Sequence, residues 1–244
     1  AVKSLLNTKN INVGKPMNNG NTPLMKASEQ GHLEIVKLLL AADKNEINRT
    51  NSYLATPLYM AAYNGHRDVV KFLLNVDGIN VNAADERGQT PLLMAVINGH
   101  VNVVNALLNA NGIDINKASN NDHTALSTAI GISNIDIVEL LVDADGIDFN
   151  AGQYDSLSPL TLAKKYARST YYSPRWRDVV RLLEQGGAKE TTTKQNKKSQ
   201  NNDSADENVA YTILIVMMGL VYGVFGIVAW RREGGWRGVK EHWL

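Results

Sequence analysis

The sequence predicts an all-α solenoid of repeated helix pairs, followed by one transmembrane helix near the C-terminus. Two observations predict this arrangement. A Thr-Pro-Leu motif or a close variant recurs at a fixed spacing along most of the chain, and a later run of 22 residues, 209–230, carries no charge. A fixed period of a few tens of residues is typical of solenoids, whose units bury their apolar faces against one another.

The composition of the 244 residues is that of an ordinary folded protein and excludes several kinds of chemistry. Hydrophobic residues make up 44% and charged residues 20%. The 25 Lys and Arg residues against 24 Asp and Glu residues give a net charge of +1, which argues against nucleic-acid binding. The chain has no cysteine, so disulfides, thiolate metal sites and cysteine nucleophiles are excluded.

The repeat has a period of 34 residues and is marked by three kinds of landmark. Thr-Pro-Leu and its variants Thr-Ala-Leu and Ser-Pro-Leu begin at Thr22, Thr56, Thr90, Thr124 and Ser158. Gly-His pairs begin at Gly31, Gly65 and Gly99. Pairs of β-branched residues begin at Ile35, Val69, Val103 and Ile137. Because all three follow one period, we expect five consecutive structural units.

Within one unit the residues specify two helices and a connector. The Thr hydroxyl can cap the first helix, and Pro is tolerated at its first position because the missing N–H would be unpaired there. Gly65 or Gly99 then ends that helix, since Gly readily takes the left-handed conformation. Val69, Val70 and Leu73 lie at helical spacing in the second helix, and an extended connector leads to the next unit.

The pattern Gly-x-Thr-Pro-Leu, Ala-Ala-x-x-Gly-His and Val-Val-x-x-Leu-Leu resembles the ankyrin repeat. The resemblance covers about residues 1–188 and implies five repeats over residues 18–188. Residues 1–17 match the second half of a unit, so we expect a partial repeat there and further sequence before it. A segment at 168–177 is an insertion that delays the last helix.

Three loops depart from the repeat pattern. Leu54, Asp122 and Ser156 stand where the pattern has Gly, so we expect those three hairpin turns to be less regular.

The region after the repeats divides into three parts. Residues 189–208 contain no large apolar side chain and are predicted to be a flexible linker. Residues 209–230 would form a helix about 33 Å long, enough to cross a bilayer core. The small residues on one face of this helix predict close packing against another transmembrane helix: Gly219, Gly223 and Gly226. Residues 231–244 form a basic and aromatic tail.

The charges around the span leave its orientation open. Arg231 and Arg232 follow it and acidic residues precede it, which favours a C-terminus in the cytosol, stroma or matrix. A span so near the C-terminus also resembles a tail anchor, which would keep the repeats on the side of synthesis.

No residue pattern indicates catalysis. His32, His66 and His100 recur with the period, so we expect them to tie a helix start to a loop. The chain has no His-Glu-x-x-His and no phosphate-binding glycine loop. We therefore predict a non-catalytic protein without a required cofactor or a metal site.

Binding to another protein is the role that the resemblance implies. Stacked ankyrin units present hairpin tips and the exposed sides of the first helices as one concave wall. Aromatic, apolar and Arg side chains dominate interface energies, so among the recognition positions we favour Tyr53, Tyr63, Arg87, Ile97, Ile132 and Tyr154. The insertion adds three candidate anchors, Tyr171, Tyr172 and Trp176, unless it is a lid over the last unit's core.

These predictions combine into a membrane-anchored scaffold that contacts the lipid bilayer and stabilises a multi-subunit membrane complex. Connectors such as residues 112–118 resemble those of ankyrin proteins in unicellular algae, which favours a photosystem or light-harvesting complex in a thylakoid over a respiratory complex in a mitochondrial inner membrane. Two alternatives remain open. One is a membrane-tethered signalling adaptor for a soluble client. The other is a pigment-carrying antenna subunit with chlorophyll near His242.

Overall fold

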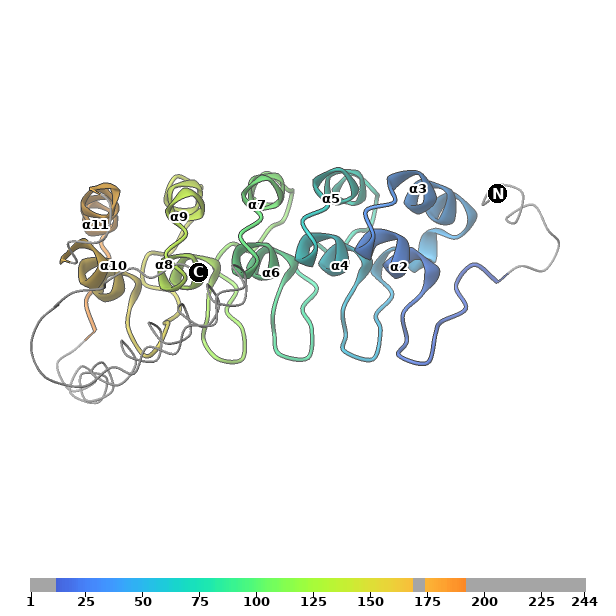
Figure 1. The fold of residues 1–244 in the computed structure, drawn as a ribbon, viewed down its shortest axis with the longest axis horizontal. Helices are drawn as coiled ribbons and strands as arrows, with labels where there is room; N and C mark the ends of the chain where they lie inside the picture. Colours follow the sequence, from blue (N-terminus) through green and yellow to red (C-terminus); the bar gives the residue numbers. More distant parts are fainter. Residues whose placement is uncertain (1–11, 169–173, 192–244) are drawn as a thin grey trace, which may run out of the picture. The chain divides into compact units, whose positions relative to one another are not determined.

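The computed structural model describes residues 12–168 and 174–191, and these contain ten α-helices, one 3-10 helix and no strand. The helices stand in two layers, an inner and an outer one (Figure 1). The inner layer comprises α2 (Pro23–Glu29), α4 (Pro57–Tyr63), α6 (Pro91–Ile97), α8 (Ala125–Gly131) and α10 (Pro159–Arg168). The outer layer comprises α3 (Leu33–Ala42), α5 (Arg67–Leu74), α7 (Val101–Leu108), α9 (Ile135–Val142) and α11 (Arg175–Gln185). The 3-10 helix η1 (Lys44–Asn48) follows α3. The prediction of an all-α solenoid is confirmed for these residues.

The start of each inner helix follows from the repeated Thr. The Oγ1 atom of Thr56 accepts a hydrogen bond from the Tyr59 N–H (3.2 Å), and Pro57 is the first residue of α4. Thr90 caps α6 in the same way through the Leu93 N–H (3.2 Å). These bonds satisfy N–H groups that a helix N-terminus otherwise leaves without a partner.

Two features favour Gly after the inner helix α4. Gly65 follows α4 with φ +77°, in the left-handed region that favours Gly. A Cβ atom at Gly65 would also lie 2.7 Å from the His100 ring of the next unit. The backbone reversal and the close approach of the next unit therefore both select Gly, as the sequence pattern predicts.

The core lies between the two layers and continues from unit to unit. Val70, Val104 and Val138 occupy equivalent positions on α5, α7 and α9 and are fully buried. Burying such a side chain contributes about 1.5–3 kcal/mol, so each unit depends on its neighbours for stability.

Asparagines join the connectors of successive units. The Nδ2 atom of Asn82 donates to the Gly112 carbonyl (2.7 Å), and its Oδ1 accepts from the Asp114 N–H (2.9 Å). Equivalent pairs of bonds are made in other units by Asn48, Asn116 and Asn150. This row of asparagines recurs with the 34-residue period, yet the sequence analysis assigned it no role.

The hairpin turns only partly follow the expectation of irregularity. Leu54 and Asp122 both have φ +62°, and the Leu54 N–H donates to the Asn51 carbonyl (3.0 Å) as the Gly88 N–H does to the Asp85 carbonyl (3.0 Å). These two turns therefore keep the Gly geometry, and the expectation was wrong for them. The fifth turn does differ, because a two-residue reversal with Ser156 at φ +61° joins Tyr154 to Leu157.

Trp176 is not available as a partner anchor. Its side chain is 2% exposed, and its ring lies 5.1 Å from the Tyr166 ring, between α10 and α11. This large side chain therefore belongs to the core between the two helices of the fifth unit. The prediction that Trp176 is a partner anchor does not fit this burial, which places the side chain in the core.

The predicted linker begins later than residue 189. The Ser158 hydroxyl donates to the Lys189 carbonyl (2.8 Å), and the Thr191 N–H donates to the Thr161 Oγ1 (2.7 Å). Residues 189–191 are therefore part of the fifth unit, although their composition is that of the polar segment.

Candidate functional site

The inner wall is the surface formed by the five hairpin tips and the exposed sides of the inner helices. In Figure 1 the hairpins project from the inner layer, away from the outer one. Neighbouring tips are joined by backbone bonds: the Glu86 N–H donates to the Tyr53 carbonyl (3.1 Å), and the Asn120 N–H donates to the Arg87 carbonyl (2.9 Å). A surface held in this way loses little conformational entropy when a partner binds.

Four of the predicted aromatic and aliphatic contact residues are exposed on this wall. Tyr53 is 58% exposed at the second hairpin tip, and Tyr63 is 45% exposed at the end of α4. Ile97 ends α6 and Ile132 follows α8, and each is 38% exposed. Because large apolar side chains are normally buried, this group on consecutive units is suited to a protein partner.

Two further exposed apolar residues extend the wall at the hairpin tips and were missed by the sequence analysis. Met17 and Leu54 lie at the first and second tips, and both are at least half exposed. For Leu54 the sequence does contain an indication of exposure, because Leu54 replaces a Gly at a hairpin tip. The sequence analysis used this replacement only to predict a less regular turn.

Tyr154 is only half-exposed and has a structural role as well. Its ring stacks on the His123 ring at 5.1 Å, and a Cβ atom on Gly131 would collide with it. Burial, and then the neighbouring charge of Asp155, raise the pKa of Tyr154 above its ordinary value. Tyr154 therefore offers a partner one face of its ring rather than the whole side chain.

Arg87 is exposed at the third hairpin tip, which Asp85 organises. One carboxylate oxygen of Asp85 accepts the N–H groups of Arg87 (2.9 Å) and Gln89 (2.8 Å), and the other accepts the Tyr59 hydroxyl (2.9 Å). Burial, and then this hydrogen bond to Asp85, raise the pKa of Tyr59, so its hydroxyl stays protonated and continues to donate. The tip that carries Arg87 is thus tied to α4 of the preceding unit.

The periodic histidines have the structural role that was expected, with a different partner. The His66 Nε2 lies 2.8 Å from the Glu29 carbonyl oxygen, and the His100 Nε2 lies 3.0 Å from the Tyr63 carbonyl oxygen. Each ring therefore reaches the end of the preceding inner helix, not a loop. In the last unit the Tyr166 hydroxyl donates to the equivalent carbonyl, that of Gly131 (2.8 Å).

Several predicted residues lie outside the part of the chain that the structure describes: Tyr171, Tyr172, Gly219, Gly223, Gly226 and His242. The predicted span 209–230 lies there too. Within residues 12–168 and 174–191, no helix is long and apolar enough to cross a membrane. The same residues contain no group of three His, Asp or Glu side chains placed to hold a metal ion.

The repeats can be compared with known protein families. A family model described as ankyrin repeats (3 copies) matches residues 1–85 and 80–153, which is more than half of the chain. No curated protein matches it.

Proposed function

Because the chain belongs to the ankyrin repeat family, whose stacked units are protein-interaction modules, we propose that it is a non-catalytic scaffold that binds its partner on the inner wall. The observation that carries this proposal is the exposure of Tyr53, Tyr63, Ile97 and Ile132 on consecutive units. Rigid aromatic and branched side chains lose little entropy on binding, and they dominate interface energies.

We further propose that residues 209–230 anchor the scaffold in a membrane, where it stabilises a multi-subunit complex. The charge-free composition of this segment supports the anchor. Anchoring raises the effective concentration of the inner wall near its partner without any new contact. A photosynthetic complex in a thylakoid is the narrower proposal, and it rests on the resemblance of the connectors alone.

The wall is tested by substituting two of its exposed residues. The double variant Tyr63→Ala, Ile97→Ala is expressed in the source organism with an affinity tag. The proteins that co-purify with the tagged variant are quantified by mass spectrometry. We expect the principal partner to be lost. The control is Leu182→Ala, because Leu182 is an exposed apolar residue (39%) on α11, in the outer layer. Equal retention by all three proteins would mean that the wall is not the binding surface.

The anchor is tested separately. Source membranes are solubilised mildly and separated on a native gel, with and without deletion of residues 209–230. We expect the full chain to migrate with a large complex and the deleted chain to leave the membrane fraction.

Photosystem subunits in the same band would support the narrower proposal. Migration alone, near the mass of the chain, would instead favour the signalling adaptor. Loss of bound pigment in His242→Leu would favour the antenna subunit.

A further inference from the structure

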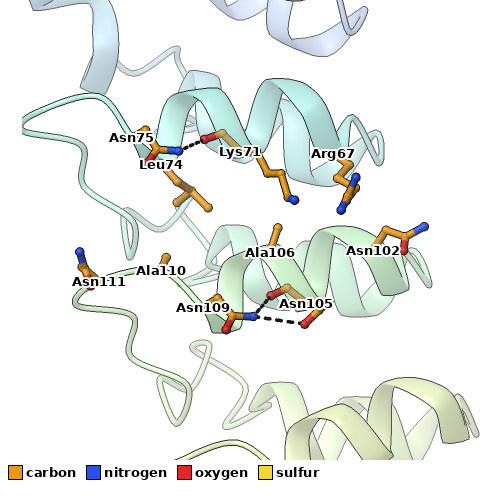
Figure 2. A pocket seen from close by; sticks show the side chains of 10 residues that line it. All are labelled: Arg67, Lys71, Leu74, Asn75, Asn102, Asn105, Ala106, Asn109, Ala110 and Asn111. Atoms are coloured by element: carbon orange, nitrogen blue, oxygen red, sulfur yellow. Dashed lines mark hydrogen bonds between the residues drawn. The ribbon is translucent and has the colours of Figure 1, made fainter.

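A polar groove of about 380 Å³ lies in the outer layer between α5 and α7 (Figure 2). Its apolar part is formed by Leu74, Ala106 and Ala110. The remaining lining residues are two cations and five amides: Arg67, Lys71, Asn75, Asn102, Asn105, Asn109 and Asn111. The groove is distinct from the inner wall, because its residues come from outer helices and the turns that follow them.

The groove carries positive charge without a compensating acid. Figure 2 shows the Arg67 and Lys71 side chains, one helical turn apart on α5, extending toward α7. No lining residue is acidic, and neither cation forms an ion pair with any residue that the structure describes. Asp68 is next to Arg67 in sequence but does not line the groove.

A cation of the outer layer is paired within the protein between α9 and α11. Asp136 and Glu139 on α9 stand one period after Asn102 and Asn105, and Arg175 on α11 bonds to both carboxylates (2.7 Å each). There the protein supplies its own acids to a neighbouring cation. In the groove the cations lie on the preceding helix, α5, and α7 carries neutral amides, so the lining offers the cations no carboxylate.

We propose that this groove docks an acidic, extended segment of a second protein, with two of its carboxylates on Arg67 and Lys71. The asparagines favour a peptide over a free phosphate. The Nδ2 atoms of Asn75 and Asn109 already donate to the carbonyls of Lys71 and Asn105 (2.7 Å each), which leaves their Oδ1 atoms as acceptors. A peptide brings an N–H donor with every residue for such acceptors, whereas inorganic phosphate near neutral pH is mainly an acceptor with few hydroxyl donors. The scaffold can then hold one protein on its inner wall and another on its outer layer.

The test measures binding of a labelled peptide of alternating Glu and Ser to the full chain in mild detergent, by fluorescence anisotropy. We expect the variant Arg67→Gln, Lys71→Gln to bind the peptide about tenfold more weakly or worse, because it loses at least one hydrogen bond to a charged group. Lys44→Gln, Arg177→Gln is the control, because it removes the same charge at exposed positions outside the groove. We expect this control to bind as the unchanged protein does.

A second variant keeps both cations and tests whether the peptide carboxylates bind beside α7. Asn102→Asp, Asn105→Glu supplies internal carboxylates beside the groove and should weaken peptide binding while circular dichroism stays unchanged. Equal affinity of all variants, or equal binding of a Gln and Ser peptide, would overturn the proposal. Displacement by inorganic phosphate as effective as by unlabelled peptide would also overturn it, in favour of a phosphate site. None of these outcomes depends on the partner of the inner wall.

Discussion

The Nε2 atom of His100 lies 3.0 Å from the carbonyl oxygen of Tyr63, which is 37 residues earlier in the chain. His100 begins α7 of the third unit, whereas Tyr63 ends α4 of the second unit. The side chain of Tyr63 is exposed on the inner wall. The backbone of a proposed contact residue is therefore positioned by the unit that follows it.

Replacing His100 by Ala should weaken the junction between these units. Loss of one hydrogen bond costs about 0.5–1.5 kcal/mol, so we expect a decrease of about 1 kcal/mol in the free energy of unfolding. Urea denaturation followed by circular dichroism measures it. His32→Ala is the matched control, because His32 holds the same position in the first described unit and forms no hydrogen bond through its ring to any described residue. Equal losses in both variants would contradict the assignment of the stability to the His100–Tyr63 bond.

Leu54 should be replaceable by Gly with a gain in stability. The backbone of Leu54 has φ +62°, and this left-handed conformation costs a residue with a Cβ about 1–2 kcal/mol. Gly removes that cost but loses more entropy on folding, so we expect a net gain of about 1 kcal/mol in the free energy of unfolding. Urea denaturation measures it, and Tyr53→Gly at the neighbouring position should give no gain. A less stable Leu54→Gly protein would show that contacts of the Leu54 side chain outweigh the backbone strain.

Trp176 should be needed for folding of the last unit rather than for binding. Truncation of a buried Trp costs about 3–5 kcal/mol, because it removes apolar contacts and leaves a cavity. We therefore expect Trp176→Ala to lower the midpoint of thermal unfolding strongly, and Arg177→Ala, at an exposed neighbour, to change it little. If Trp176→Ala kept full stability but lost its partner, the interpretation of Trp176 as a core residue would fail.

Docking of residues 189–191 onto α10 should depend on pH. Lys164 bonds to Glu190 (2.6 Å), and this hydrogen bond, and then the charge of Lys164, lower the pKa of Glu190 from its ordinary value of 4.5. A carboxylate with a lowered pKa stabilises the docked state above its ordinary pKa, and the contribution is lost as the pH falls below it. We therefore expect the amide resonance of Thr191 to shift toward its undocked position as the pH falls below 4.5.

The control for this titration is Glu190→Gln, which removes the charge at all pH values. Its Thr191 resonance should be nearly independent of pH in the same range. An identical pH profile in the unchanged protein and in this variant would assign the transition to another group.

Much of the fold can be predicted from local signals that recur. Thr56 and Thr90 cap their helices, Gly65 reverses the chain, and Val70 lies in the core, because each depends on a few neighbouring residues and the period repeats the signal in every unit. The exposed wall residue Tyr63 could be found in the same way, since its position in the repeat defines its exposure.

The rest depends on contacts between units that no local pattern encodes. Trp176 is of a residue type that often anchors interfaces, yet α10 and α11 enclose it and place its ring against Tyr166. Tyr154 is partly buried and packs against His123 and Gly131, which belong to the preceding unit. Whether Arg67 and Lys71 pair with a carboxylate depends on the residues that α7 places across from them. The linear sequence thus sets the repeat and its register, whereas burial and charge pairing are set by which side chains the stacked units bring together.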